Sequence, residues 1–555
     1  MGVVEGEARP PWHRESLGEL WRRQPDWEKR LIKTGIVLAV VLGLGFSGQL
    51  QRSGQFWAIV IVVIAVFNWR SILKLFWWAL DAVGVKDAKA RWAKQSPLMQ
   101  RAIPPVAIAL PVIFLTWAAG TPPSPALLVL LAVCYVLYVL PSNARKYALP
   151  VTVLALAITY PLYLDKLFQV PVFKVFPSMD TMVAIALFSM MAIGLNMVVG
   201  YAGLLDLGYV AFYAIGAYTA AWLASPHFSQ YGIDFDLGAT GVPQGIGGIH
   251  ISIWLVILIA AALTALGGIL IGLPTLRLRG DYLAIVTLGF GEIVAQVARN
   301  GDSGGLGFNL TNGPPGINPI DPPGFGSHLN FIIQQGQYVN FVDLIYWSAL
   351  ALLLITIFCS IRLRDSRLGR AWIAIREDET AAAAMGIPLM RTKTWAYAGG
   401  AFFGGAAGAW YGTYKQGVFP DDFFFNISIF ILCMVILGGM GNVWGVIAGA
   451  AFLTYLDREG LANISGWIND NITNCDPTAA DPSRPISGGC FNGPLLSFGI
   501  YGAIIVLVML LRPGGLIPER RRLLEVETGV HDQPLYDVQS AGAHEIVDET
   551  LPEDV

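Results

Sequence analysis

Residues 399–412 read GGAFFGGAAGAWYG, an apolar run in which every fourth residue from Gly400 to Gly412 is glycine. A spacing of four places these glycines on one face of an α-helix, where the missing side chains let another helix backbone come close. The pattern predicts an all-α bundle of tightly packed membrane helices. The same face could instead line a pathway through the bundle, and the spacing alone leaves both interpretations open.

The stretch VILGGMGNVWGVIAGA (435–450) continues this spacing and interrupts an apolar segment. The four-residue spacing recurs at Gly441, Gly445 and Gly449. The run GGMGN (438–442) divides 426–456 into two halves of about 20 Å at ~1.5 Å per residue, too short for the ~30 Å hydrocarbon core. A discontinuous or re-entrant helix pair near 426–456 is therefore predicted. Broken membrane helices must be buried in protein or face a water-filled cavity, so Gly438, Gly439 and Gly441 are candidate pathway residues.

The composition supports a polytopic membrane protein. Of 555 residues, 55% are apolar and only 14% are charged, and the mean hydropathy is +0.56. Soluble domains carry charge on roughly a quarter of their residues. Apolar segments long enough to span the bilayer are predicted at 34–50, 55–78, 103–119, 126–140, 147–164, 179–200, 203–223, 252–273, 282–298, 341–361, 393–413, the pair within 426–456, and 496–511.

The distribution of Lys and Arg predicts the topology. Seven lie in 1–33, seven in 70–101 and seven in 362–393, whereas 225–250 and 300–340 contain none. Because short basic loops stay in the cytosol, we expect both termini on the cytosolic side of a bacterial inner membrane. The first apolar run follows charged and Trp- and Pro-rich residues, unlike a cleavable secretion signal.

The chain divides into segments of different amino-acid composition. We expect a cytosolic N-terminal segment (1–33), a transmembrane extension (34–175), a Gly-dense core (176–515) with a cytosolic loop (362–392) and a periplasmic insert (457–495), and a cytosolic tail (516–555) that is disordered. Cys475 and Cys490 lie in the insert, where an oxidising periplasm could close a disulfide between them. Without neighbouring His or further Cys, no metal site is expected there.

The cytosolic loop is a dense charged insert, RLRDSRLGRAWIAIREDETAAAAMGI (362–387). Asp378 can act as an N-cap, Ala381–Ala384 is a strong helix-forming run, and Gly386 with Pro388 ends the helix. This predicts a helix of about two turns whose small side chains let a partner's surface come close. The simpler alternative is a solvated loop that carries positive-inside charge.

Three polar residues within the predicted spans are further candidates for a pathway. An ionised side chain at mid-bilayer costs about 2.5–3.5 kcal/mol, so it normally faces protein or water. Glu292 lies well inside 282–298, and Asp206 lies nearer the end of its helix. For both, structural pairing and pathway lining are equally supported. Asn196 is the uncharged candidate. Asparagines in membrane helices more commonly form an interhelical hydrogen bond than line a pathway.

No catalytic centre is indicated. The sequence contains no HExxH or CxxC motif, no Ser/His/Asp or Cys/His arrangement, and no GxxxxGK[ST] pattern for binding ATP. We therefore expect no catalytic residue, no metal, no cofactor bound by this chain and no nucleic-acid partner. A transport role explains the same scarcity of titratable groups.

Five motifs in one order carry a resemblance to a known family. They are GLNMVVGYAGLLDLGYVAFYAIGAYTAAWL (194–223), LPTLRLRGDYLAIVTLGFGEI (273–293), LTNGPPGI (310–317), SRLGRAWIAIREDETAAAAMGI (366–387) and VILGGMGNVWGVIAGA (435–450). Together they resemble the permease subunits of branched-chain amino acid ABC transporters, of the LivM type. The resemblance implies an ABC importer permease fold, with 176–515 as the permease core.

The resemblance also implies partners and roles. Expected partners are a second homologous permease subunit, two ATP-binding subunits that use the ATP, a periplasmic substrate-binding protein, and the lipid bilayer. The cytosolic loop would dock on an ATP-binding subunit. The residues implied in this coupling are Gly369, Arg370, Arg376, Glu377, Asp378, Glu379, Ala381, Ala382 and Gly386. Where related importers have Glu-Ala-Ala, this chain has Thr380-Ala381-Ala382.

Other functions remain open at this stage. Related permeases carry urea, amides or other amino acids, and the binding protein largely chooses the cargo. An ion-coupled secondary transporter would use an intramembrane carboxylate such as Glu292 and would need no ATPase. A membrane-embedded transferase would need a polar catalytic cluster. Apolar, Gly-lined helices with few fixed charges suit Leu, Ile or Val, but they would suit urea as well.

Overall fold

A computed structural model describes the permease-like core of the chain. The described residues are 151–161, 177–239, 247–276, 278, 281–302, 308–324, 341–469, 486–487, 490–491, 493–511 and 514–517. The segment 1–33, most of the extension 34–175, the tail from 518 and Cys475 lie outside them. Cys490 lies in a two-residue strand, β5 (Cys490–Phe491), paired with β4 (Ile486–Ser487). The predicted disulfide therefore lies outside the described residues.

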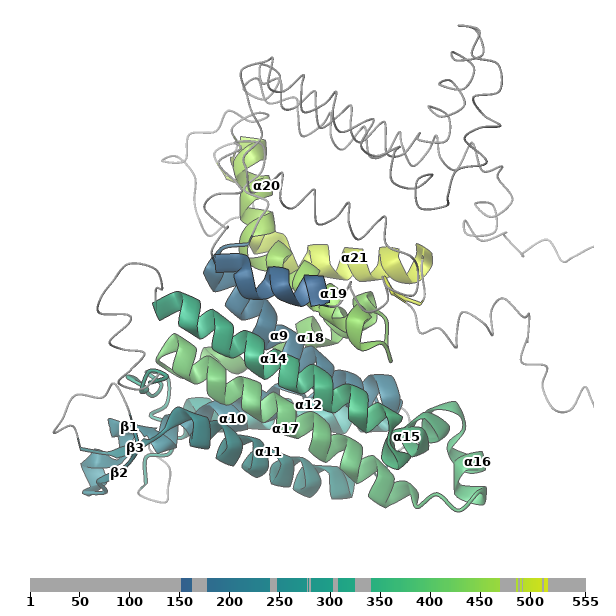
Figure 1. Cartoon of the computed structure of the whole chain (residues 1–555), viewed down its shortest axis with the longest axis horizontal. Helices are drawn as coiled ribbons and strands as arrows, with labels where there is room; N and C mark the ends of the chain where they lie inside the picture. The colour runs from purple at the N-terminus through teal and green to yellow at the C-terminus, as the bar shows by residue number, and fades with distance from the viewer. Residues whose placement is uncertain are drawn as a thin grey trace, which may run out of the picture. The chain divides into compact units, whose positions relative to one another are not determined.

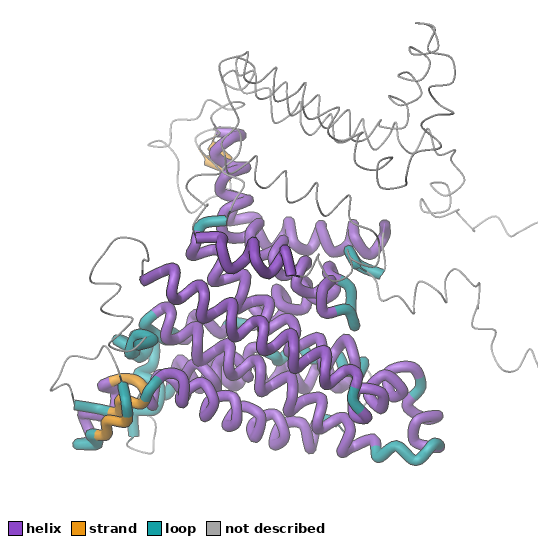
Figure 2. The backbone as a smooth tube through the Cα atoms, viewed as in Figure 1, coloured by secondary structure: helices purple, strands orange, loops and turns teal. Residues whose placement is uncertain are grey.

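The described part is predominantly helical, as predicted (Figure 2). In this part of the chain, four helices are long and apolar enough to cross a membrane. They are α9 (Met179–Asn196) with its continuation η1 (Met197–Tyr201), α11 (Ile253–Thr275), α12 (Asp281–Asn300) and α14 (Phe341–Asp365). Each lies within a few residues of a predicted span, because long apolar runs determine helix position locally.

The chain separates into two compact units, taken here one at a time. The described parts of the first unit come from 1–187, 325–354 and 453–504. In it, the short apolar helix Val151–Pro161 receives hydrogen bonds from Tyr346 and Trp347 of α14, at 2.7 and 2.8 Å. The insert expected at 457–495 begins with helical residues, in η4 (Leu456–Gly460) and α20 (Leu461–Ile468).

The first unit ties the start of the insert to the start of α9. Arg458 of η4 pairs with Asp180 at 3.2 Å, and Glu459 accepts a hydrogen bond from the backbone N–H of Ser178 at 2.7 Å. Asp457 also accepts a hydrogen bond from the hydroxyl of Tyr501, which lies in α21 (Ser497–Leu511), a helix preceded by η6 (Gly493–Leu496). These charged contacts fix where the polar insert leaves the apolar helices.

The second unit is built around α10 (Val210–Leu223), α11 and α17 (Leu389–Lys415), which lie side by side (Figure 1). The glycine face of α17 is filled by neighbouring helices, as the packing interpretation predicts. A side chain at Gly408 would overlap the carbonyl oxygen of Tyr213, and one at Gly400 would lie 2.9 Å from the carbonyl oxygen of Gly194. Tyr209 donates a hydrogen bond to the carbonyl oxygen of Gly400 at 2.9 Å. This face is a packing surface.

Helix α10 begins later than the predicted span 203–223. Residues 202–209 are not helical, because Gly203 has a left-handed φ of +69° and the carboxylate of Asp206 accepts the N–H of Gly208 at 2.9 Å. A side chain that bonds its neighbouring backbone in this way favours a turn over a helix. Helix α10 therefore starts at Val210 as a short helix of 14 residues.

The predicted discontinuous pair is present. Helix α18 (Phe425–Gly438) ends at a turn, and α19 (Val443–Tyr455) begins after it. Gly439 and Gly441 have φ values of +113° and +88°, which other residues rarely adopt. After the turn α19 packs against α18, since a side chain at Gly445 or Gly449 would overlap a carbonyl oxygen of α18.

A small three-stranded sheet closes one end of the second unit. Strand β3 (Ile249–Ile251) lies between β1 (Ala224–Ser225), to which it is antiparallel, and β2 (Phe235–Leu237), to which it is parallel. The 3-10 helix η2 (Pro226–Tyr231) follows β1. The loop 308–324 crosses to the end of α17, where Ile317 and Val418 exchange backbone hydrogen bonds at 3.0 Å. The 3-10 helix η3 (Pro420–Phe423) then leads into α18.

Candidate functional site: the charged loop and the broken helix

The charged insert folds into two short helices, α15 (Arg367–Glu377) and α16 (Glu379–Ala384). Asp378 separates them and caps α16, because its carboxylate accepts the backbone N–H groups of Thr380 and Ala381 at 2.8 and 3.0 Å. Hydrogen bonds from the Thr380 hydroxyl and these two N–H groups lower the pKa of Asp378. Gly386, with a φ of +85°, ends the helix. The predicted cap, helix and stop are confirmed.

The insert is anchored to the bundle and is not simply a solvated loop. The indole N–H of Trp372, which is 1% exposed, donates to the carbonyl oxygen of Thr392 at 2.8 Å. Gly369 is buried, and a side chain there would overlap the carbonyl oxygen of Arg364. Lys393, also buried, forms an ion pair with Glu379 at 2.8 Å. Three independent contacts therefore fix α15 and α16 against α14 and α17.

The outward surface of the loop differs in part from the expectation. Ala381 is exposed, but Ala382 is only 4% exposed and packs within its own chain. Met385 is 85% exposed, and the sequence analysis did not select it as a candidate. Its position just before Gly386, which ends the helix, could have indicated that it lies at the exposed tip of the loop. Arg370, Glu377 and Asp378 border this surface, and all three are exposed.

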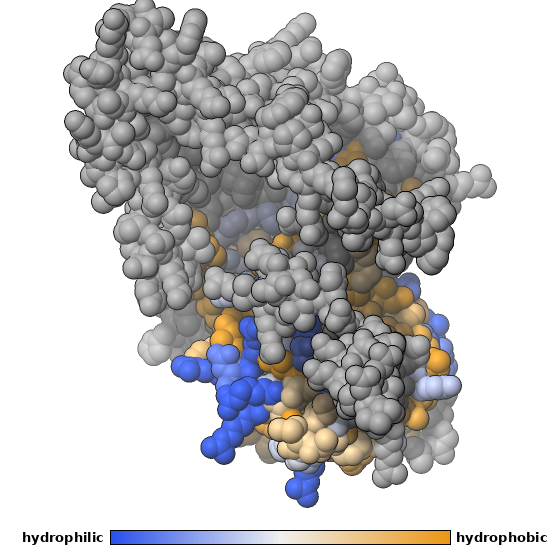
Figure 3. All heavy atoms as spheres, turned by 90° about the vertical axis from the view of Figure 1, so that its right-hand side faces the viewer, coloured by the Kyte–Doolittle hydropathy of each residue, from blue (hydrophilic) through white to orange (hydrophobic). Residues whose placement is uncertain are grey.

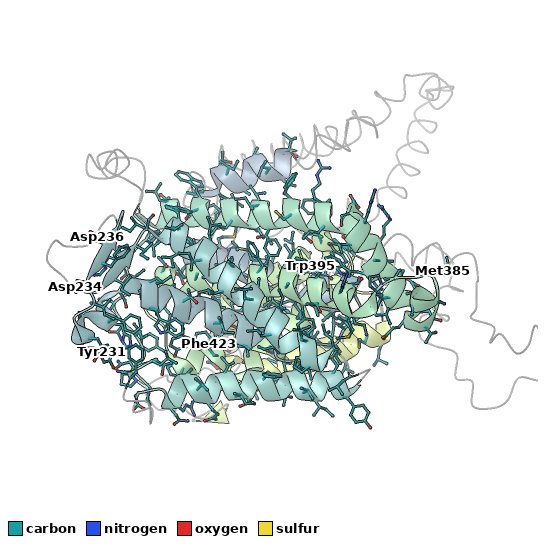
Figure 4. All side chains as sticks on the ribbon, turned by 90° about the horizontal axis from the view of Figure 1, so that it is seen from below. Tyr231, Asp234, Asp236, Met385, Trp395 and Phe423 are labelled. Carbon is teal, nitrogen blue, oxygen red and sulfur yellow. The ribbon has the colours of Figure 1, made fainter. Side chains whose placement is uncertain are left out.

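Met385 and the small sheet mark opposite ends of the second unit. Figure 4 shows Met385 at one end, and Tyr231, Asp234 and Asp236 at the other. Hydrophilic side chains gather in the lower part of the face that Figure 3 presents, which is the side of Figure 1 on which α15 and α16 lie. The basic insert and the sheet between 224 and 251, which lacks Lys and Arg, therefore occupy opposite ends, as the charge distribution predicts.

Arg376 connects α15 to the end of α9. Its guanidinium donates to the carbonyl oxygen of Gly200 at 2.6 Å, and its aliphatic part lies against Gly203, where a side chain would come within 3.0 Å of Arg376 Cγ. Gly200 belongs to η1, a π-helical turn. Such turns are rare in proteins, and those that occur are often found at functional sites. The resemblance implied a coupling role for Arg376, and in the structure its guanidinium bonds a carbonyl oxygen of its own bundle.

Asn196 continues this connection to the broken helix. It is fully buried, and its side-chain oxygen accepts the backbone N–H of Gly441 at 2.9 Å. The predicted interhelical hydrogen bond therefore joins the end of α9 to the turn between α18 and α19. Arg376, Gly200, Asn196 and Gly441 form one continuous series of contacts from the charged loop to this turn.

Residues 514–517 hold the same turn from another side. The N–H groups of Leu516 and Ile517 donate to the carbonyl oxygens of Leu437 and Gly438 at 2.8 and 3.1 Å. The side chain of Asn442 donates to the carbonyl oxygen of Ile517 at 3.0 Å. Sequence reasoning missed this segment, although its two adjacent glycines, Gly514 and Gly515, were a signal of close backbone contact.

A cavity separates the charged loop from residues 202–205. Its volume is about 180 Å³, and Arg376, Glu379 and Lys393 line it together with Ile375. The loop therefore does not pack fully against the start of the α10 segment.

The two candidate carboxylates have different environments. Asp206 is 2% exposed; one oxygen accepts the N–H of Gly208, and the other has no hydrogen-bond partner among the described residues. Leu207, next to it, donates to the hydroxyl of Thr287 on α12 at 3.1 Å. Glu292, also on α12, is exposed. Neither carboxylate joins the contacts around Asn196 and Gly441.

A buried pair at the sheet end was also missed. His250 of β3 and Asp321 of the loop 308–324 lie 2.8 Å apart, and both are under 10% exposed. Burial raises the pKa of Asp321, and the hydrogen bond with His250 opposes that rise. No three His, Cys, Asp or Glu side chains gather as a metal site within the described ranges. The pair fixes the loop onto the sheet.

Helices that cross or partly cross the membrane, a broken helix pair and an anchored charged loop together define a polytopic membrane protein of the permease class. Over residues 179–509 the chain matches the family described as "Branched-chain amino acid transport system / permease component". The chain belongs to this family, which confirms the resemblance carried by the five motifs. It is therefore a subunit of a transport system.

Two relatives make the same point. The chain is 33% identical, over 70% of its length and 79% of the relative, to the high-affinity branched-chain amino acid transport system permease protein LivM of Escherichia coli (strain K12). It is 35% identical, over 63% of its length and 72% of the relative, to the LivM protein of Salmonella typhimurium (strain LT2). No solved structure matches the chain.

Proposed function

We propose that this chain is the permease subunit of an ATP-driven importer for branched-chain amino acids. It forms part of the translocation pathway, and it receives the ATPase stroke through α15 and α16. The observation that carries this proposal is the series of contacts from Arg376 through Gly200 and Asn196 to Gly441. Such a series gives a force on the charged loop a direct route to the broken helix.

The proposed assembly contains a second homologous permease, two ATP-binding subunits and a periplasmic substrate-binding protein. Support comes from the two relatives, which are named as permease proteins of high-affinity branched-chain amino acid transport systems. The chain has no GxxxxGK[ST] motif, so the ATP site lies on partner subunits. The Lys and Arg distribution supports an inner-membrane protein with both termini in the cytosol.

The exposed surface of α16, with Met385 at its end, is the proposed contact with an ATP-binding subunit. A displacement of α15 acts on η1 because Arg376 holds the Gly200 carbonyl, and η1 directly follows Asn196, the last residue of α9. The turn between α18 and α19 follows, since its backbone is not held within a regular helix. ATP can drive this change only if the two conformations bind it with different affinity.

The test replaces Arg376 in the complete transporter. In proteoliposomes with the loaded binding protein, Arg376→Ala lowers ATP-dependent leucine uptake at least tenfold while ATP hydrolysis continues. The matched control is Arg391→Ala, an exposed arginine at the start of α17 that lies outside the contact series. Unchanged uptake in Arg376→Ala would refute the route. Wild-type uptake that needs an ion gradient and no ATP would instead support a secondary transporter.

A further inference from the structure

Helix α12 exposes a polar stripe along its second half. Glu292, Gln296 and Asn300 follow one another at four-residue spacing, and all three are exposed. Four-residue spacing places them on one face. The other face packs into the second unit through six buried residues: Leu283, Ala284, Thr287, Gly291, Ala295 and Ala298. The stripe therefore faces away from the unit's core.

Glu292 lies near the middle of α12, a helix long and apolar enough to cross a membrane. It is eleven residues from Asp281 at one end of α12 and eight from Asn300 at the other, about 16 and 12 Å at ~1.5 Å per residue. A charged side chain facing lipid at this depth costs about 2.5–3.5 kcal/mol. This cost favours an environment of water or polar groups for the Glu292 face.

Among the described side chains of α12, Glu292 is a charge that its own surroundings leave uncompensated. Arg299, the last residue but one of α12, pairs with Asp421 at 3.0 Å and lies over the ring of Phe424 at 4.9 Å. For Glu292, no hydrogen bond or ion pair is found among the described residues. Gly289, three positions earlier, has nothing within 4 Å of where its side chain would be, so space is open beside the carboxylate.

Two helices begin against the opposite side of α12, near the middle of its length. A side chain at Gly208 would overlap the carbonyl oxygen of Thr287 and would lie 3.4 Å from the N–H nitrogen of Gly291, next to Glu292. At the same level, the first N–H of α10, from Val210, donates to the hydroxyl of Ser428 in the first turn of α18 at 2.9 Å.

We propose that the Glu292 carboxylate binds the α-ammonium group of the amino acid during its passage, and that Gln296 and Asn300 form the polar wall leading to it. This inference rests on the proposed transport function and specifies its cargo chemistry. A carboxylate forms strong, charge-assisted hydrogen bonds with an ammonium group. Urea and neutral amides have no such group, so this site favours amino acids over them.

Exposure of the stripe also suits transport. A fully buried ion pair would hold the cargo too long, whereas conduction needs a site that binds well enough to admit the cargo and weakly enough to release it. Asn300 donates to the backbone carbonyl of Gln296 at 3.0 Å, which holds the outer part of the stripe together. The aliphatic side chain of the cargo can contact the exposed apolar neighbours Ile285 and Ile293.

The experiment compares Glu292→Gln with Glu292→Asp in the complete transporter. Leucine uptake and the ATP hydrolysis stimulated by leucine-loaded binding protein are measured in the same proteoliposomes. We expect Glu292→Gln, which keeps the shape but removes the charge, to lower uptake at least tenfold while hydrolysis changes less than twofold. Glu292→Asp, which keeps the charge, recovers part of the uptake. The matched control is Val297→Ala, at an exposed position on the adjoining side of α12.

Three results would overturn the inference. Unchanged uptake in Glu292→Gln would show that the charge is not used by the cargo. Loss of the assembled complex in both Glu292 variants would show that the carboxylate pairs with another subunit or another part of this chain. Loss of hydrolysis together with uptake would place Glu292 in coupling. In each case wild-type uptake stays ATP-dependent, so the proposed function stands while the cargo site fails.

A labelling pattern provides a second measurement. Single cysteines at Gly289 and Gln296 should react with a charged, water-soluble thiol reagent, and saturating leucine-loaded binding protein should slow that reaction. A cysteine at Val297, which is exposed on the adjoining side of α12, should react more slowly. Equal labelling at all three positions, or labelling unaffected by cargo, would contradict a water-filled path along the stripe.

Discussion

The side-chain oxygen of Asn196 accepts the backbone N–H of Gly441 at 2.9 Å, and this bond joins the end of α9 to the turn between α18 and α19. Asn196 is fully buried, and Gly441 lies in a turn with a left-handed φ of +88°. Backbone groups in such a turn lack the partners that a helix supplies. The asparagine therefore satisfies a buried N–H that the broken helix leaves free.

Replacing Asn196 tests the value of this bond. Asn196→Leu keeps a similar size but removes the acceptor, so the buried N–H of Gly441 loses its partner at a cost of about 1–3 kcal/mol. We expect a lower melting temperature of the purified protein in detergent, together with reduced uptake. Asn426→Leu, at an exposed position of α18, is the control and should change stability by less than about 0.5 kcal/mol. Equal melting temperatures would show that the bond contributes nothing.

Asp378 makes the structure of the charged loop depend on pH. Its pKa lies below the ordinary value of 3.8, because the Thr380 hydroxyl and two backbone N–H groups bond the carboxylate in the folded protein. A lowered folded pKa stabilises α16 fully above the unfolded value and loses this stabilisation as the pH falls through the folded value. Backbone hydrogen exchange at Thr380 and Ala381 should therefore lose protection only in strong acid.

Two variants separate the cap from the charge of Asp378. Asp378→Ala removes the acceptor, and we expect α16 to lose exchange protection already at neutral pH. Asp378→Asn keeps an acceptor oxygen but cannot titrate, so protection should persist and no longer depend on acid. If Asp378→Ala were as protected as wild type, the carboxylate would not be the cap that starts α16.

Sequence predicted the features that depend on local spacing. The caps around α16, the glycine face of α17 and the break at 438–442 follow from residues within a few positions of one another. The start of α10 was wrong by seven residues, because the turn at Asp206 competes locally with helix formation and apolar periodicity does not report it.

The contacts that make a site from these elements could not be predicted. Arg376 and Gly200 are 176 positions apart in the sequence, and Ile517 donates its backbone N–H to the carbonyl oxygen of Gly438, 79 positions earlier. Nothing in the local pattern indicates which distant backbone group a side chain will reach. The same limit applies to Ala382, whose burial depends on how α16 rotates, and to the pairing of His250 with Asp321.

The glycine face of α17 gives a prediction in which two glycines of one helix respond in opposite ways. A methyl group at Gly408 would overlap the carbonyl oxygen of Tyr213, whereas one at Gly399 would meet only Met197 Sδ, at 3.6 Å. Gly408→Ala should therefore separate α17 from α10 and cost about 1–3 kcal/mol. Gly399→Ala should stabilise the protein by up to ~1 kcal/mol, because alanine favours the helix. Melting temperatures in detergent measure both changes. If the two variants had the same melting temperature, close backbone contact along this face would not be what holds the helices in place.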